Sequence, residues 1–296
     1  MRRRFLLIDN AASGFGSRAL VGQVAAIMKQ HGASIDRCPE GTKDEAFALA
    51  ARAGLGGAYD AIVAAGGDGT VRQVARALAG SDTPVGLIPL GTGNVLAHEI
   101  GLGRGPEKLA ALLLHGRAAP VMAPHANGEL FLLMAGAGFD GRVINALSHD
   151  IKGRLGKLAY VRPVLGALMH PPDVLDVLVD GVRYEAGWVV LANARHYGGA
   201  FVIAREASLH APGLKAVLFR GQGRQQLLSS LLALASGTLA SNRYVTVIDC
   251  DSAEIRSHAP IPVQVDGDAF GITPLRIEAA RQRVMLIVPE ADATKR

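Results

Sequence analysis

The chain has 296 residues, of which 49% are hydrophobic, and a formal net charge of +5 with a sequence pI of about 9.4. This length allows two domains or one large one, with ample material for a core. The positive balance fits anionic partners such as nucleotide phosphates or an acidic membrane. Only 5% of the residues are aromatic, and basic and aromatic residues do not interleave, so nucleic acid is not an expected partner.

The two cysteines, Cys38 and Cys250, form neither a disulfide framework nor a metal-binding spacing, and free thiols in a reducing compartment are expected. The basic start of the chain is followed by an apolar run, Phe5–Ile8, that is too short for a signal peptide. No apolar stretch reaches the length of a membrane span. We therefore expect a cytoplasmic protein, at most peripheral to the inner face of the membrane.

In chain order, the first part alternates strands and helices up to about residue 122. Strands are predicted at Phe5–Ile8, Ser34–Cys38, Asp60–Ala65 and Val85–Leu90. Helices are predicted at Ser17–His31, Lys43–Ala53, Val71–Leu78, Val95–Ile100 and Pro106–His115. This alternation predicts a mainly parallel sheet covered by helices, in a first domain over residues 1–122.

From Val121 onward short strands dominate, separated by Gly, Pro and Asp turns. They are predicted at Leu130–Ala135, Val174–Val179, Tyr184–Leu191, Leu214–Phe219, Tyr244–Asp249, Pro262–Val265, Leu275–Ala279 and Arg283–Val288. Two helices interrupt them, at Gly156–Met169 and Arg224–Ser236. The pattern predicts an antiparallel sandwich or barrel, in a β-rich second domain over residues 123–296.

Three of the predicted parallel strands end in small polar turns. Gly66-Gly67-Asp68-Gly69-Thr70 follows the third strand, Gly91-Thr92-Gly93-Asn94 follows the fourth, and the segment from Asp9 to Gly14 follows the first. Glycines let backbone N–H groups approach a phosphate, and the carboxylate of Asp68 can hold a divalent cation or its water. The alternative is a set of tight connections in which Asp68 only bonds nearby N–H groups. Because ligands bind outside the carboxyl ends of parallel strands, three such turns favour a nucleotide site.

These turns resemble the three nucleotide-site motifs of the diacylglycerol kinase catalytic domain, and the similarity is closest to its bacterial soluble lipid kinase branch. The matching residues are Asn10-x-x-Ser13-Gly14, Gly66–Thr70 and Gly91–Asn94. Gly136-Ala137-Gly138-Phe139-Asp140 and Val265-Asp266-Gly267-Asp268 resemble the two later motifs. The order is the same, and the matches run from residue 10 to residue 268. GGDG alone is shared with NAD kinases and phosphofructokinases, so the whole set carries the resemblance.

The resemblance implies an N-terminal three-layer α/β domain, a C-terminal antiparallel β-sandwich domain and an active site in the cleft between them. It implies an ATP-dependent lipid kinase that transfers the γ-phosphoryl group to a hydroxyl of diacylglycerol or a related lipid, with Mg²⁺ arriving on the nucleotide. Asp68 is the implied metal-binding and catalytic acid. The implied nucleotide-binding residues are Asn10, Ser13, Gly14, Gly66, Gly67, Asp68, Gly69, Thr70, Gly91, Thr92 and Asn94.

Asp266 and Asp268 flank a glycine in a stretch that, by pattern alone, predicts an Asp-Gly hairpin turn. In the family this turn reads Asp-Gly-Glu and supplies the base for the acceptor hydroxyl. Asp268 stands where the family has Glu. The resemblance implies that the pair is catalytic and leaves open which of the two takes the proton.

The chain departs from the family in three places. Arg72-Gln73 replaces a common Asn-Glu, and Val95 replaces a common Asp. An acidic metal loop of the family corresponds to 207–215, where all three acids are missing and Lys215 ends the run. Since a hard cation prefers oxygen ligands, we expect no structural Mg²⁺ in this loop and expect Lys215 to place a positive charge there.

Several residues allow two interpretations. Thr42 either contacts the nucleotide or caps the next helix, and Asn94 can hold phosphate, cap a helix, or do both. The leucines of the helix Arg224–Ser236 either pack on the sandwich or face lipid. A basic set either is solvated or docks on anionic lipid headgroups, and it comprises Arg142, Lys152, Arg154, Lys157 and Arg162.

Two other functions compete with a lipid kinase. An NAD kinase-like enzyme shares the GGDG turn, but the Gly91–Asn94 turn and the Asn10–Gly14 motif suit the lipid branch better. A catalytically weak nucleotide- or lipid-binding protein would explain the missing acids of the metal loop. The retained Asp68, Asp266 and Asp268 favour an enzyme, since a binding protein does not need all three.

Overall fold

The computed structural model describes residues 1–9, 15–38, 43–103, 105–147, 160–170, 173–221 and 223–290. The chain folds into two compact units, Met1–Val121 with Gln282–Arg296, and Met122–Arg281. It passes from one to the other within β5 (Arg117–Ala126) and returns within β18 (Leu275–Val288). Some residues named above lie outside the described ranges, namely Asn10, Ser13, Gly14, Thr42, Lys152, Arg154 and Lys157.

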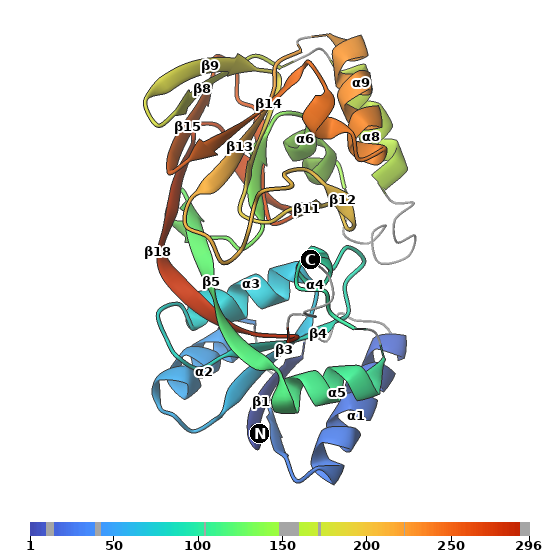
Figure 1. Cartoon of the computed structure of the whole chain (residues 1–296), viewed down its shortest axis with the longest axis vertical. Coiled ribbons are helices and arrows are strands. Elements are labelled where there is room, and N and C mark those ends of the chain that lie inside the picture. Colours follow the sequence, from blue (N-terminus) through green and yellow to red (C-terminus); the bar gives the residue numbers. More distant parts are fainter. Residues whose placement is uncertain are drawn as a thin grey trace. The chain divides into compact units, whose positions relative to one another are not determined.

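The first unit contains the predicted parallel sheet (Figure 1). Its strands lie in the order β2 (Ser34–Arg37), β1 (Arg4–Asp9), β3 (Ala61–Gly66) and β4 (Val85–Pro89). All neighbours in this order are parallel, and the end of β18 adds a further parallel strand beside β4, with Leu286 opposite Val85. The carboxyl ends of β1, β3 and β4 therefore lie at one edge of the sheet.

Helices cover both faces of this sheet, because successive side chains of a strand point to opposite sides. Phe5 and Leu7 of β1 pack in one core with α1 (Phe15–Gln30) and α5 (Pro106–His115). Leu6 and Ile8, which alternate with them, are equally buried. On that side α2 (Lys43–Leu55) and α3 (Asp68–Ala77) pack together. The three-layer arrangement confirms the prediction for this half of the chain.

The second unit is an antiparallel sandwich, as predicted. Its six-stranded sheet has the order β14 (Val245–Cys250), β13 (Leu214–Phe219), β10 (Trp188–Ala192), β7 (Met134–Ala137), β16 (Pro262–Val265) and β17 (Asp268–Ile272). Its other sheet pairs the first part of β18 with β15 (Ser252–Ser257), then β8 (Leu175–Val179) and β9 (Val182–Ala186). Alternate residues of both sheets form one apolar core.

Short elements complete the two units. In the first, α4 (Val95–Glu99) follows β4. In the second, β6 (Glu129–Leu130) pairs with β5, and β11 (His196–Tyr197) pairs with β12 (Phe201–Val202). Among the described residues of the second unit, the helical elements are α6 (Phe139–Asn145), α8 (Val161–Met169), α9 (Arg224–Ala235) and the 3₁₀ turn η2 (Leu239–Ser241).

Four predicted strands were wrong in their bounds. The strand predicted at Leu130–Ala135 begins only at Met134, because the N–H groups of the preceding residues bond to a distant carboxylate. The strand predicted at Tyr184–Leu191 breaks at Gly187, where an added Cβ would lie 3.0 Å from the carbonyl oxygen of Gly221. The last two predicted strands are one, β18. Strands β5, β15 and β17 and helix α6 were not predicted.

Candidate functional site

In the first unit, the two glycine turns lie side by side at the ends of β3 and β4. The N–H of Leu90 donates to the carbonyl oxygen of Gly66 at 2.9 Å. A Cβ added to Gly91 would lie 2.8 Å from the Cα of Gly67, closer than real Cβ contacts allow. Glycine is therefore required here for the two turns to touch backbone to backbone.

Asp68 joins these two turns through its carboxylate. Its Oδ2 accepts the N–H of Val95 at 2.9 Å, and its Oδ1 accepts the N–H of Leu96 at 3.0 Å. These are N–H groups of the first turn of α4, so the cap of α4 comes from the other glycine turn. Asn94 is the N-cap residue of α4, one of the two roles expected for it, but its side chain makes no capping hydrogen bond. Asn94 has a left-handed backbone (φ 43°), and its Nδ2 donates to the carbonyl oxygen of Gly91 at 2.5 Å.

The residues around Asp68 fit a phosphate accompanied by a hydrated cation. Gly67 to Thr70 and Gly91 to Asn94 are all partly exposed, whereas β3 is buried along its whole length. Carboxylate oxygens are ligands that divalent cations, or the waters they carry, prefer. Within the described ranges no three His, Cys, Asp or Glu side chains gather into a metal cluster. Mg²⁺ that is bound with a nucleotide takes most of its ligands from phosphate and water.

In the second unit, Asp266 and Gly267 form the predicted two-residue hairpin turn between β16 and β17. Their φ angles are 49° and 80°, and Val265 pairs with Asp268 across the hairpin. Two central residues with positive φ define a type I′ turn, for which Asp-Gly is a favoured sequence. The turn places two carboxylates at one end of the hairpin.

The two carboxylates of the hairpin differ in their surroundings. Asp266 is only 7% exposed, and it accepts three backbone N–H groups. They come from Leu132 at 2.9 Å, Leu133 at 2.8 Å and Met134 at 3.0 Å. Asp268, by contrast, is partly exposed at the start of β17. Asp266 thus anchors the segment that enters β7, while Asp268 lies where solvent reaches it.

A series of buried hydrogen bonds links this turn to Asp140. Gln264 donates from Nε2 to Oδ2 of Asp140 at 3.0 Å, and its Oε1 accepts the N–H of Gly267 at 2.9 Å. Asp140 and Gln264 are each 2% exposed. Burial raises the pKa of Asp140 to about 7, although hydrogen bonds from Gln264 and Gly141 partly offset the effect. Sequence reasoning placed Asp140 in a motif without a role, and missed Gln264, whose only signal was a polar residue in an apolar strand.

Lys215 occupies the segment where the resemblance places an acidic metal loop. Its Nζ lies 3.3 Å from Oε2 of Glu206 and also pairs with Oδ1 of Asp249. The side chain of Lys215 is 15% exposed, and its hydrogen bond to Asp249 raises the pKa of Lys215. An ammonium group thus stands between two carboxylates. Of the other departures, Val95 is buried and supplies one of the N–H groups bound by Asp68.

The fold combines an α/β unit with paired glycine turns and a β-sandwich unit that carries an acidic hairpin. Residues 4–126 match the model of the diacylglycerol kinase catalytic domain. Residues 134–288 match that of the YegS C-terminal NAD kinase beta sandwich-like domain. The chain belongs to the diacylglycerol kinase and YegS-like lipid kinase family, which confirms the resemblance read from the motifs.

Relatives cover most of the chain. A "Probable lipid kinase YegS-like" of Pseudomonas aeruginosa is 41% identical over 79% of this chain and 78% of its own length. A "Diacylglycerol kinase" of Mycobacterium tuberculosis is 28% identical over 95% of this chain and 94% of its own. The crystal structure of a "putative diacylglycerol kinase" from Bacillus anthracis has a TM-score of 0.79 at 21% identity and covers 98% of this chain and 96% of its own. That likeness confirms the fold.

Proposed function

We propose that this chain is an ATP-dependent lipid kinase, which transfers the γ-phosphoryl group to a hydroxyl of diacylglycerol or a related lipid. The observation that carries the proposal is the Asp68 carboxylate, which bonds the N–H groups of Val95 and Leu96 and so locks two glycine turns at the edge of a parallel sheet. Family membership and the names of the relatives support the same activity.

The first unit would hold the nucleotide. The glycine turns would present backbone N–H groups to the phosphates, with Thr70 and Thr92 donating from their hydroxyls. Asn10, Ser13 and Gly14 of the first motif would complete the set. Mg²⁺ bound with the nucleotide spreads the charge of the transferring phosphoryl group, and Asp68 would hold it directly or through water.

In the second unit we assign the base to Asp268 and a positioning role to Asp266. The carboxylate of Asp268 would accept the proton of the acceptor hydroxyl while that oxygen bonds to the γ-phosphorus and ADP leaves. Asp266 is less suited to this step, because three backbone N–H groups already occupy its carboxylate. Asp-Gly-Asp in place of Asp-Gly-Glu shortens the reach of the base by one methylene.

Two other assignments remain as competing hypotheses. An NAD kinase would phosphorylate NAD, and the names of the relatives favour a lipid acceptor instead. A protein that only binds nucleotide or lipid would not need an exposed carboxylate at Asp268. Nor would it need the carboxylate of Asp68 to hold the two glycine turns together. We also propose that the ammonium of Lys215, paired with Glu206 and Asp249, stands in for a divalent cation in its loop.

The test is transfer of labelled γ-phosphate from ATP, with Mg²⁺, to a panel of hydroxyl lipids in mixed micelles and to NAD in parallel. Wild type is run beside Asp68→Ala and Asp268→Asn, with Asp82→Ala as a control because Asp82 is a 91% exposed acid of the first unit. A labelled lipid made by wild type and the control alone supports the proposal and names the acceptor. Labelled NADP, or nucleotide binding without any labelled product, would overturn it.

A further inference from the structure

Two neighbouring helices of the second unit expose apolar side chains on their outer faces. On α8, Val161, Leu165 and Met169 are 52%, 57% and 68% exposed, and on α9, Leu228 and Leu232 are 50% and 62% exposed. Each set repeats every four residues, so its members share one face of their helix. The predicted leucine face of α9 is therefore divided, since Leu234 packs inward while these two leucines face outward.

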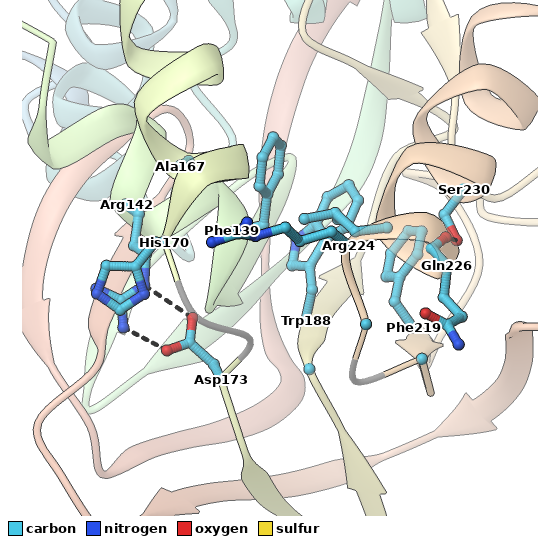
Figure 2. A pocket seen from close by; sticks show the side chains of 14 residues that line it. Phe139, Arg142, Ala167, His170, Asp173, Trp188, Phe219, Arg224, Gln226 and Ser230 are labelled. Atoms are coloured by element: carbon cyan, nitrogen blue, oxygen red, sulfur yellow. Dashed lines mark hydrogen bonds and ion pairs between the residues drawn. The ribbon is translucent and has the colours of Figure 1, made fainter.

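The inner faces of α8 and α9 are fixed on the sandwich around a shared pocket (Figure 2). The pocket is shallow and open to solvent, and Trp188 and Phe219 are stacked in its wall at 3.7 Å between ring centroids. Arg224 at the start of α9 donates to the carbonyl oxygen of Met169 at 2.9 Å. The two helices thus form one platform, and their outer residues are held in place together.

The charged side chains of α8 and α9 are all positive. Neither α8 nor α9 contains an Asp or Glu, while Arg162 and Arg224 are exposed. Arg205 lies at the other end of α9, next to the exposed Glu206, and donates to the carbonyl oxygen of Gly237 at 2.7 Å. Arginines can keep the guanidinium at a polar surface while their stems lie along apolar contacts. Exposed apolar residues bordered by cations match the interfacial layer of an anionic bilayer.

We propose that the outer face of α8 and α9, which we call the helical platform, docks the protein on an anionic lipid bilayer. The inference rests on the proposed function, because a lipid acceptor resides in a bilayer. Within the described residues no helix is long and apolar enough to cross a membrane. The contact would be interfacial, with the five apolar side chains inserted among the headgroups and acyl chains and the arginines at the level of the phosphates.

The first experiment measures co-sedimentation with phosphatidylcholine vesicles, with and without phosphatidylglycerol, in the absence of nucleotide. Leu165→Ser combined with Leu232→Ser removes apolar area from both helices. Val182→Ser combined with Val247→Ser is the matched control, because these residues are 55% and 42% exposed on strands of the same unit. We expect the platform variant to lose about tenfold or more in vesicle affinity and the control to bind as wild type does.

The charge contribution is tested with Arg162→Glu, which leaves the apolar residues in place. Binding to vesicles with phosphatidylglycerol should fall about fivefold or more and become less sensitive to salt, while binding to pure phosphatidylcholine stays the same. This variant also keeps the proposal testable if the leucine variant fails to fold, since Arg162 is an exposed side chain.

Three results would overturn the proposal. Wild type could fail to bind either vesicle, or the control variant could lose as much affinity as the platform variant. Wild type could also be a dimer in sedimentation velocity that the platform variant converts to monomer, so that a second copy covers this face. Because vesicle binding needs no catalysis, these results are separate from the phosphate-transfer assay. A platform variant that phosphorylates a monomeric short-chain acceptor normally, but not the same lipid in anionic vesicles, would support docking.

Discussion

Asp68 in the first unit and Asp266 in the second both lie in glycine-containing turns, and both send their carboxylates to distant backbone N–H groups. The bonds join residues 27 positions apart for Asp68 and up to 134 apart for Asp266. Asp68 accepts two N–H groups and is partly exposed, whereas Asp266 accepts three and is 7% exposed. In both turns the acid fixes a distant backbone segment. The exposure of the carboxylate then decides whether it can also contact a ligand.

The largest expected effect is the loss of kcat on substitution of Asp268, which distinguishes its role from that of Asp266. Asp268→Asn should lower kcat by about 10²–10⁴-fold, because the amide cannot accept the proton of the acceptor hydroxyl. The free energy of unfolding should change by no more than about 0.5 kcal/mol, since Asp268 is partly exposed. Steady-state kinetics and urea unfolding check the two parts. An unchanged kcat would return the role of base to Asp266.

The next effect is the pH dependence of stability that comes from Asp140, which is linked to the hairpin through Gln264. Burial raises the pKa of Asp140 to about 7 from its ordinary value of 3.8. The folded state then holds a proton that the unfolded state releases, so the free energy of unfolding falls as the pH rises from about 4 to about 7. The difference of about three pKa units corresponds to a loss on the order of 4 kcal/mol.

Asp140→Asn should remove this slope, and the test is urea unfolding of both proteins across that pH range. Tyr197 lies near Asp140, and burial, followed by the charge of Asp140, raises the pKa of Tyr197. Because its pKa is raised, Tyr197 stays neutral in this window and does not obscure the slope. A wild type and variant with parallel pH profiles would show that Asp140 titrates normally.

The comparison of Asp68 with Asp266 is tested by the same substitution at both positions. Asp266→Asn should lower the free energy of unfolding by about 3 kcal/mol, because an amide NH₂ replaces one of the oxygens that bind buried N–H groups. Asp68→Asn should cost only about 1 kcal/mol, since the cap it breaks is partly exposed. Nucleotide affinity with Mg²⁺, measured by calorimetry, should instead fall only for Asp68→Asn. Equal losses of stability would contradict the difference in burial.

The smallest expected effects come from the glycines of the two turns. Gly91→Ala should cost about 2 kcal/mol, because its Cβ would lie 2.8 Å from the Cα of Gly67 and force the turns apart. Gly267→Ala should cost about 1 kcal/mol, since its φ of 80° is strained for Ala but no atom lies within 4 Å of the new Cβ. Thermal unfolding checks this order, and Gly91→Ala should have the lower Tm. Of the two substitutions, only Gly91→Ala should lower the affinity for nucleotide.

Sequence patterns predicted the elements whose periodicity is local. The strand at Leu214–Phe219 and the helix at Pro106–His115 have the predicted bounds, because apolar alternation and the Pro start of a helix are properties of neighbouring residues. The strand β15 was missed because its sequence, SAEIRS, is mostly polar and only the pairing with β8 and β18 makes it a strand. The strands predicted at Leu275–Ala279 and Arg283–Val288 are one strand, β18, because its pairing with β15, β5 and β4 is not visible in the local pattern.

By itself the sequence determined the fold class, the order of the turns and the family, since glycines and acids at fixed spacing need no partner to be recognised. What these acids contact follows from long-range packing. The tertiary structure assigned Asp68 to the N–H groups of Val95 and Leu96, Asp266 to the segment before β7, and Lys215 to Glu206 and Asp249. These contacts join residues far apart in the chain, and burial, which sets the electrostatics of each carboxylate, exists only once the units have folded.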